Sequence, residues 1–115
     1  MKPVVQNRQL AKEPGFIINI KASGNYKVLN IIDEELIGKK LTEGSFSLYL
    51  DPRYFLGEKV YEMQLKDLIL NNSIINLVGN RSVEFALKMG FGTKESVRVI
   101  DGVSFLIIYK FTDNY

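Results

Sequence analysis

The chain has 115 residues, which suits a single domain, and 46% of them are hydrophobic and 24% charged. This balance is typical of a globular protein with a buried core. Its apolar runs are far shorter than the roughly 20 residues that a membrane-spanning helix needs. Cysteine is absent, which excludes disulfides and thiolate metal sites. No signal peptide is recognisable at the start, so we expect a cytoplasmic protein with no membrane partner.

The net charge of +2 is concentrated at the start of the chain. Residues 1–14 carry three basic side chains and one acidic side chain, whereas the rest of the chain holds equal numbers of each. The remainder therefore lacks the basic excess that is typical of nucleic-acid-binding domains. We interpret residues 1–15 as a basic extension, either a flexible terminus or an arm that contacts a polyanion. The basic residues of such an arm are Lys2, Arg8 and Lys12.

The first half of the domain predicts mainly strands. Residues 16–31 alternate in polarity on both sides of a Ser23-Gly24-Asn25 turn, which predicts a hairpin. Residues 33–38 predict one or two helical turns, with Asp33 as the N-cap and Gly38 at the end. Residues 45–52 alternate again and predict a strand that ends at a proline.

The second half predicts two helices and a hairpin. Residues 62–72 have the spacing of a short helix, and residues 74–89 predict a second helix that Gly90 terminates. Residues 97–111 predict a hairpin around Asp101-Gly102, with its last strand inside a sheet. Strands at both ends with helices between them predict an α+β fold over residues 16–115: a mainly antiparallel sheet with about two helices packed on one face.

Gly79 interrupts the predicted second helix, where glycine costs about 1 kcal/mol relative to alanine. One explanation is a stripe of small residues that lets another element approach closely. A second is a break at which Asn80 caps a new helix. A third is a cluster of backbone N–H groups that, together with Arg81, binds a phosphate. We favour close packing, because the sequence shows no glycine-rich loop between a strand and this helix.

The sequence argues against most enzyme chemistry. Histidine is absent, which removes the usual general base at neutral pH and the commonest metal ligand. Nucleotide-binding glycine motifs and zinc spacings are also missing. The acidic run Asp33-Glu34-Glu35 suits the start of a helix, where the dipole stabilises carboxylates. We therefore predict no catalytic residue, cofactor or metal. The remaining alternative is an enzyme that uses Asp33, Glu34 and Lys39 together with a metal ion.

Two short stretches have residue types that suit recognition. Lys39 and Lys40 follow the acidic run, and Arg53 and Tyr54 lie at a turn after Pro52. Arginine and tyrosine together suit phosphate contacts and base stacking. They equally suit a solvated loop with a half-buried aromatic ring.

Four segments carry a combined pattern: "DEELIGKKLTEG", "YFLGEKV", "NLVGNRSVEFALKMGF" and "VRVIDGVSFLII". Together they resemble a small archaeal family known as domain of unknown function 424, over roughly residues 16–111. The matching residues are Asp33, Glu34, Glu35, Leu36, Gly38, Lys39, Gly57, Glu58, Asn76, Leu77, Val78, Gly79 and Arg81. The last segment departs from the family pattern, because Ser104-Phe105-Leu106 stands where the family has proline, histidine and alanine.

The resemblance implies an uncharacterised archaeal cytoplasmic protein. We predict a non-enzymatic module that binds RNA or a ribonucleoprotein and is linked to translation. The alternative is a protein-interaction or homodimerisation module that uses a sheet edge or an apolar patch. The candidate binding residues are Lys2, Arg8, Lys12, Lys39, Lys40, Arg53, Tyr54 and Arg81.

Overall fold

The computed structural model of the protein describes residues 14–110 and confirms the predicted α+β fold. Lys2, Arg8 and Lys12 lie outside the described residues. Strands are β1 (Phe16–Ser23), β2 (Tyr26–Asp33), β3 (Lys40–Glu43), β4 (Phe46–Tyr49), β5 (Glu58–Val60), β6 (Ile74–Val78), β7 (Arg98–Ile100) and β8 (Val103–Tyr109). Helices are α2 (Glu62–Leu70), α3 (Asn80–Lys88) and the 3-10 turns η1 (Glu34–Leu36) and η2 (Lys94–Ser96).

Six strands form one sheet in the order β5-β1-β2-β6-β8-β7. All neighbours in it are antiparallel except β2 and β6, which run parallel. The two predicted hairpins are confirmed as β1–β2 and β7–β8. The second turn, Asp101-Gly102, has φ values of 50° and 76°, the left-handed pair that matches the twist of a two-residue hairpin.

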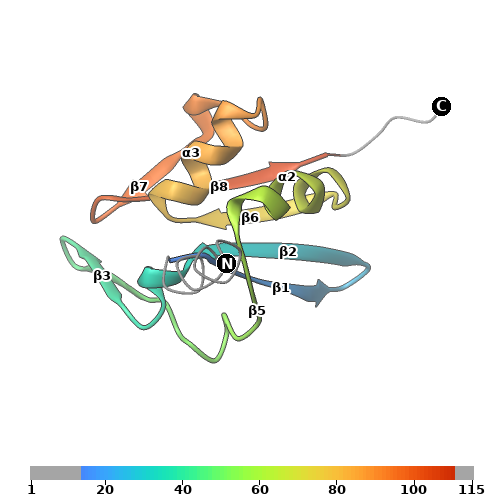
Figure 1. The fold of residues 1–115 in the computed structure, drawn as a ribbon. Coiled ribbons are helices and arrows are strands. Elements are labelled where there is room, and N and C mark those ends of the chain that lie inside the picture. The colour runs from blue at the N-terminus through green and yellow to red at the C-terminus, as the bar shows by residue number, and fades with distance from the viewer. Residues whose placement is uncertain (1–13, 111–115) are drawn as a thin grey trace, which may run out of the picture.

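Both helices pack on the same side of this sheet (Figure 1). The main core lies between them and the strands, because alternate residues of β1, β2, β6 and β8 point to that side. Each fully buried leucine or isoleucine there contributes about 1.5–3 kcal/mol. The buried residues of this core are Phe16, Leu29, Ile31, Val60, Leu65, Ile69, Ile75, Leu77, Val83, Phe85, Ala86, Leu106 and Ile108.

The opposite side of the sheet is covered at one end only. There the β3–β4 hairpin and the segment 50–57 close a second core formed by Ile32, Leu41, Leu50, Phe55, Val78 and Val103. Beyond that core no further element covers the strands within residues 14–110, and most of their side chains on this side are exposed or half-buried, although Asn30 and Ile74 are buried. We call this uncovered half the open face; its residues include Lys21, Val28, Asn30, Ile74, Asn76, Ile107 and Tyr109.

The prediction of one helix over residues 74–89 is wrong. Residues Ile74–Val78 form β6, Gly79 makes the turn, and α3 begins at Asn80. The strand lies between β2 and β8 and is buried on both faces, so it reads as a nearly continuous apolar run. Such a run cannot be distinguished from a buried helix by periodicity alone.

Candidate functional site

The carboxylate of Asp33 holds the start of α3. Asp33 ends β2, and the parallel strand β6 passes through Gly79 into the helix at the same edge of the sheet. Its Oδ2 accepts a hydrogen bond from the Arg81 N–H and its Oδ1 accepts one from the Ser82 N–H, each at 2.9 Å. The residue is only 2% exposed. Two N–H groups that a helix start leaves unpaired are thus satisfied by a buried anion.

Gly79 is required by this arrangement. Its φ of 122° belongs to the region that favours glycine, and a Cβ there would lie 2.2 Å from Cγ of Asp33. The glycine permits close approach, but to a carboxylate from the same chain and not to a phosphate. Asp33 is the N-cap residue of η1, as predicted, but its side chain makes no hydrogen bond to that turn. Its carboxylate binds the N–H groups of α3 instead.

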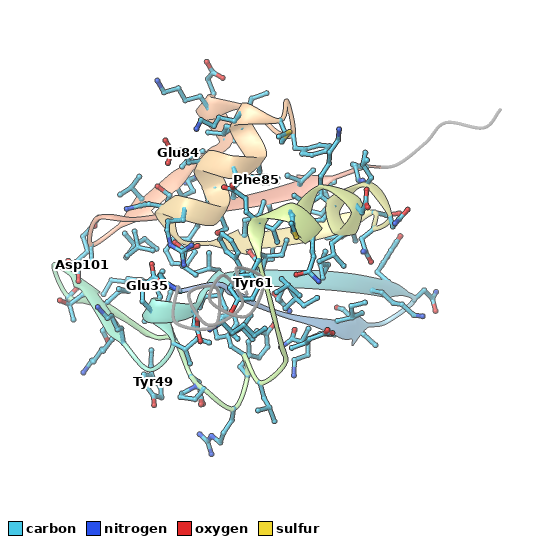
Figure 2. The ribbon with its side chains drawn as sticks, viewed as in Figure 1. Glu35, Tyr49, Tyr61, Glu84, Phe85 and Asp101 are labelled. Atoms are coloured by element: carbon cyan, nitrogen blue, oxygen red, sulfur yellow. The ribbon has the colours of Figure 1, made fainter. Side chains whose placement is uncertain are left out.

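Arg81 extends the arrangement to the surface. Its Nε and Nη2 donate to the two oxygens of Glu35 at 2.9 and 2.6 Å, and Nη2 also donates to the carbonyl of Gly15 at 2.8 Å (Glu35 is labelled in Figure 2). The guanidinium lies over the Phe16 ring, 4.6 Å from its centroid. Glu34 accepts from the Gly15 N–H at 2.9 Å. We call Asp33, Glu34, Glu35 and Arg81 the Asp33 cluster.

The pKa values of the carboxylates in the Asp33 cluster are shifted in opposite directions. Burial raises the pKa of Asp33, and this outweighs the lowering by the N–H groups of Arg81 and Ser82. The hydrogen bond from Arg81 lowers the pKa of Glu35, and the N–H of Gly15 lowers that of Glu34. The guanidinium of Arg81 is therefore already paired, which leaves it poorly suited to bind an external phosphate.

A second polar group crosses the sheet on the open face. Asn19, Asn30 and Asn76 lie directly opposite one another on β1, β2 and β6. Nδ2 of Asn76 donates to Oδ1 of Asn30 at 2.9 Å, and Nδ2 of Asn30 donates to Oδ1 of Asn19 at 3.0 Å. Nδ2 of Asn19 donates to the carbonyls of Tyr54 and Leu56 at 2.9 and 3.1 Å. We call these three asparagines the Asn ladder.

Two recesses meet at the end of the Asn ladder. One, of about 450 Å³, lies over the open face, and the other, of about 290 Å³, reaches under the β3–β4 hairpin. Asn76 and Tyr54 line both recesses, so the two adjoin each other, and we call them together the groove. Lys21 is the charged residue in the wall of the first recess, and its Nζ lies 5.0 Å from the centroid of the Tyr54 ring. The groove therefore combines an amide, an aromatic face and a positive charge.

Another recess, of about 460 Å³, lies between α2 and α3, where Tyr61, Glu84 and Phe85 are labelled in Figure 2. It offers less to an anionic ligand. Arg81 in its wall is paired with Glu35, and the carboxylates of Glu62 and Glu84 offset the positive charge of Lys88. We therefore regard the groove on the open face as the better candidate site.

Comparisons with known proteins agree with the sequence pattern. A family model described as "Protein of unknown function (DUF424)" matches residues 20–111. The chain belongs to this family. A crystal structure of an uncharacterized conserved protein from Methanopyrus kandleri has a TM-score of 0.68 to this DUF424 protein at 17% identity. The match covers 87% of this chain and 96% of that one and shows a shared fold. No curated protein matches.

Some of the DUF424 motif residues fall into three structural groups. Those of the first and third motifs meet in the Asp33 cluster, with Gly79 and Arg81 packed against Asp33, Glu34 and Glu35. Gly57 lets the segment 50–57 cross β1, because a Cβ there would lie 2.0 Å from the carbonyl oxygen of Ile18. Asn76 belongs to the Asn ladder. The remaining motif residues are Leu36, Gly38, Lys39, Glu58, Leu77 and Val78.

The predicted binding residues of this DUF424 protein do not gather at one place. Tyr54 lines the groove and is 47% exposed. Arg53 points into solvent and pairs with Asp51 at 3.0 Å. Lys39 and Lys40 are exposed near the start of β3 and line neither recess of the groove. Arg81 belongs to the Asp33 cluster, on the other side of the sheet.

Sequence reasoning missed Lys21, Asn19 and Asn30, and it named Asn76 only as a family-motif residue. A usable signal was present, because asparagine is disfavoured in strands and each of the three asparagines lies between isoleucine or leucine neighbours. What the sequence could not give is the register that places them opposite one another across three strands.

Two further findings bear on the function class. Within residues 14–110, no three carboxylates are placed so that they could hold a metal ion together. In the same part of the chain, no helix is long and apolar enough to cross a membrane.

Proposed function

We propose that this DUF424 protein is a non-enzymatic cytoplasmic module that binds single-stranded RNA, alone or in a ribonucleoprotein, on the open face of its sheet. The observation that carries the proposal is the groove in which Tyr54, Lys21 and Asn76 meet. A link to translation, and an archaeal setting, stay predictions drawn from the family resemblance.

The chemistry of the groove supports an unpaired nucleic acid over a duplex. Exposed rings on a sheet surface stack on bases, and bases are available for stacking only where they are unpaired. Tyr54 and Tyr109 both expose about half or more of their surface on this face, at 47% and 61%. Amide groups of asparagine hydrogen-bond to base edges in such sites.

The charge around the groove favours the same ligand. Lys21 lies at one side of the open face on β1, and Arg98 lies on β7 opposite Phe105. Asp51, the carboxylate in the smaller recess, is paired with Arg53. A phosphate backbone can therefore contact a lysine on one side without meeting an unpaired carboxylate in the groove. Because few charges take part, we expect weak binding that depends on salt.

The test is fluorescence anisotropy with a labelled single-stranded RNA of about 12 nucleotides, titrated between about 50 and 200 mM salt. We expect affinity to fall with salt, and Lys21→Gln to reduce the slope of log K against log salt by about one. Lys27→Gln is the matched control, because Lys27 lies on the adjacent strand and outside the recess. No binding at low salt, or an unchanged slope for Lys21→Gln, would refute the proposal.

One observation favours protein association as a second candidate. β8 extends past β7, which pairs only with residues 103–105. Ser104 O and Lys110 N bond toward β6 and its flanks, so by strand alternation the backbone N–H and C=O of Ile107 point to the other edge. Such an edge can add a strand from another chain. Light scattering that gives a monomer at all concentrations would count against self-association.

A further inference from the structure

We propose that Asn76 reads an exocyclic amino group of an unpaired base, with Oδ1 as the acceptor. The inference rests on the proposed RNA function and names the chemical group that the groove selects. Its basis is the direction of the Asn ladder, which ends at the point where the two recesses meet.

The direction of the ladder follows from its fixed end. The backbone carbonyls of Tyr54 and Leu56 can only accept hydrogen bonds, so the amino group of Asn19 must face them. Oδ1 of Asn19 then faces Asn30 and must receive its amino group. The same step repeats from Asn30 to Asn76. The amino group of Asn76 is thus directed back along the ladder, and its carbonyl oxygen lies at the opposite end.

The surroundings of Asn76 leave that oxygen to a ligand. Its neighbour on β8 is Ile107, whose side chain has no hydrogen-bond donor. Asn76 is half-buried and lines both recesses, whereas Asn30 behind it is 1% exposed. Burying the amide of Asn30 is unfavourable unless it is fully bonded, and an aliphatic residue would pack there without that demand. The ladder therefore does more than fill the sheet, because it orients the amide at its end.

An acceptor oxygen in this position distinguishes bases. Adenine carries its N6 amino group and cytosine its N4 amino group at the edge where a pyrimidine such as uracil carries the O4 acceptor. Two acceptors that face each other repel, and a buried oxygen without a donor is unfavourable. We therefore expect adenine and cytosine to be preferred over uracil, with the ring stacked against Tyr54 and the backbone near Lys21.

The experiment compares homopolymers on the full-length wild-type protein. Labelled oligo(A), oligo(C), oligo(U) and an oligomer of purine riboside, which lacks the amino group of adenosine, are titrated at low salt. We expect oligo(A) and oligo(C) to bind about 3- to 10-fold more tightly than oligo(U), the range for one neutral hydrogen bond. Purine riboside should bind more weakly than adenosine although its ring has the size of adenine, and it should lose no more than uridine, because it lacks the amino donor but places no acceptor against Oδ1. This comparison needs no variant.

Variants then assign the preference to the ladder. Asn76→Val should bring the oligo(U)-to-oligo(A) ratio of dissociation constants close to one. Asn19→Val, which removes a positioning residue, should lower the ratio in part. Asn72→Ala is the control, because it removes a structural hydrogen bond to Leu68 at the end of α2 and should leave the ratio unchanged. Partial unfolding cancels in this ratio, because both constants come from the same sample.

The outcomes separate the two proposals. Equal binding of oligo(A), oligo(C) and oligo(U), or purine riboside binding as well as adenosine, would overturn the reading by Asn76 and leave RNA binding intact. A ratio that persists in Asn76→Val would also overturn it. Absence of binding to every oligomer at low salt would overturn the RNA proposal itself.

Discussion

The Asp33 cluster connects β2 and η1 to helix α3, and the Asn ladder connects three neighbouring strands, yet the two polar groups end differently. In the Asp33 cluster both oxygens of Asp33 accept N–H groups of α3, and Arg81 is paired with Glu35. The Asn ladder is bonded at its β1 end and stops at Asn76 beside a groove. The charged groups of the Asp33 cluster are thus paired within the protein, whereas the Asn ladder ends with Oδ1 of Asn76 at a recess.

This difference separates residues that hold the fold from those that can bind. Asp33 satisfies a helix start that would otherwise bury unpaired N–H groups, so its effect is on stability. Nδ2 of Asn76 donates a hydrogen bond to Asn30, whereas Oδ1 of Asn76 is directed away from the ladder. Changes in the Asp33 cluster should therefore alter the free energy of unfolding, and changes around the groove should alter binding.

The largest expected effect belongs to Gly79→Ala. The new Cβ would lie 2.2 Å from Cγ of Asp33 at a φ of 122°, so strain and overpacking add. We expect a loss of about 3 kcal/mol or more in the free energy of unfolding, measured by urea denaturation. Gly90→Ala is the matched control, because its φ is also positive but nothing lies within 4 Å of the added atom.

The double variant Gly79→Ala/Asp33→Ala tests the cause of that loss. If the carboxylate of Asp33 is the obstacle, the double variant should lose less stability than the two single variants together. Additive losses would show that the obstacle lies elsewhere.

The next effect in size is that of Asp33→Asn. The amide has the same shape but offers only one acceptor, so its amino group faces one of the two N–H donors of Arg81 and Ser82. We expect a loss of about 2 kcal/mol at pH 7 and unchanged RNA affinity per folded molecule. Weaker RNA binding at equal folded fraction would contradict the separation of the two groups.

Tyr54→Ala should give the opposite result. Loss of a stacking ring is expected to weaken RNA binding by about tenfold, within the range measured for base–aromatic contacts, with little change in the denaturation midpoint. Tyr54→Phe should retain the affinity, because stacking needs the ring and not the hydroxyl. Phe46→Ala, which removes an exposed ring outside the groove, is the control. Equal loss in both alanine variants would exclude Tyr54 as a specific contact.

The comparison also explains what the sequence could predict. The β1–β2 and β7–β8 hairpins were predictable because alternation and turn residues are local signals. β6 was not, since burial on both faces erases its period. The Asp33 cluster joins residues 46 or more positions apart, as in the bond between Arg81 and Glu35. Its residues could be recognised as family-motif residues in the sequence. The parallel pairing of β2 with β6, which brings them together, could not be predicted.

The smallest expected effect is on the pH dependence of stability. It tests whether burial, which raises the pKa of Asp33, outweighs the hydrogen bonds, which lower it. Burial raises its pKa above the unfolded value of 3.8, so the folded state binds this proton more readily than the unfolded state. Its contribution to stability must then increase as pH falls from neutral toward 3.8. Glu34 and Glu35 act in the opposite sense, because their pKa values are lowered and their contribution is lost as pH falls below 4.5.

Asp33→Asn isolates the first of these contributions. The variant keeps Glu34 and Glu35 but cannot titrate at residue 33, so their effects cancel in the difference between wild type and variant. We expect the stability advantage of the wild type to widen as the pH is lowered from neutral toward 3.8, when urea denaturation is followed at each pH. An advantage that narrows would mean that the N–H groups of Arg81 and Ser82 stabilise the carboxylate more than burial opposes it. The start of α3 would then favour the ionised carboxylate of Asp33 over its protonated form.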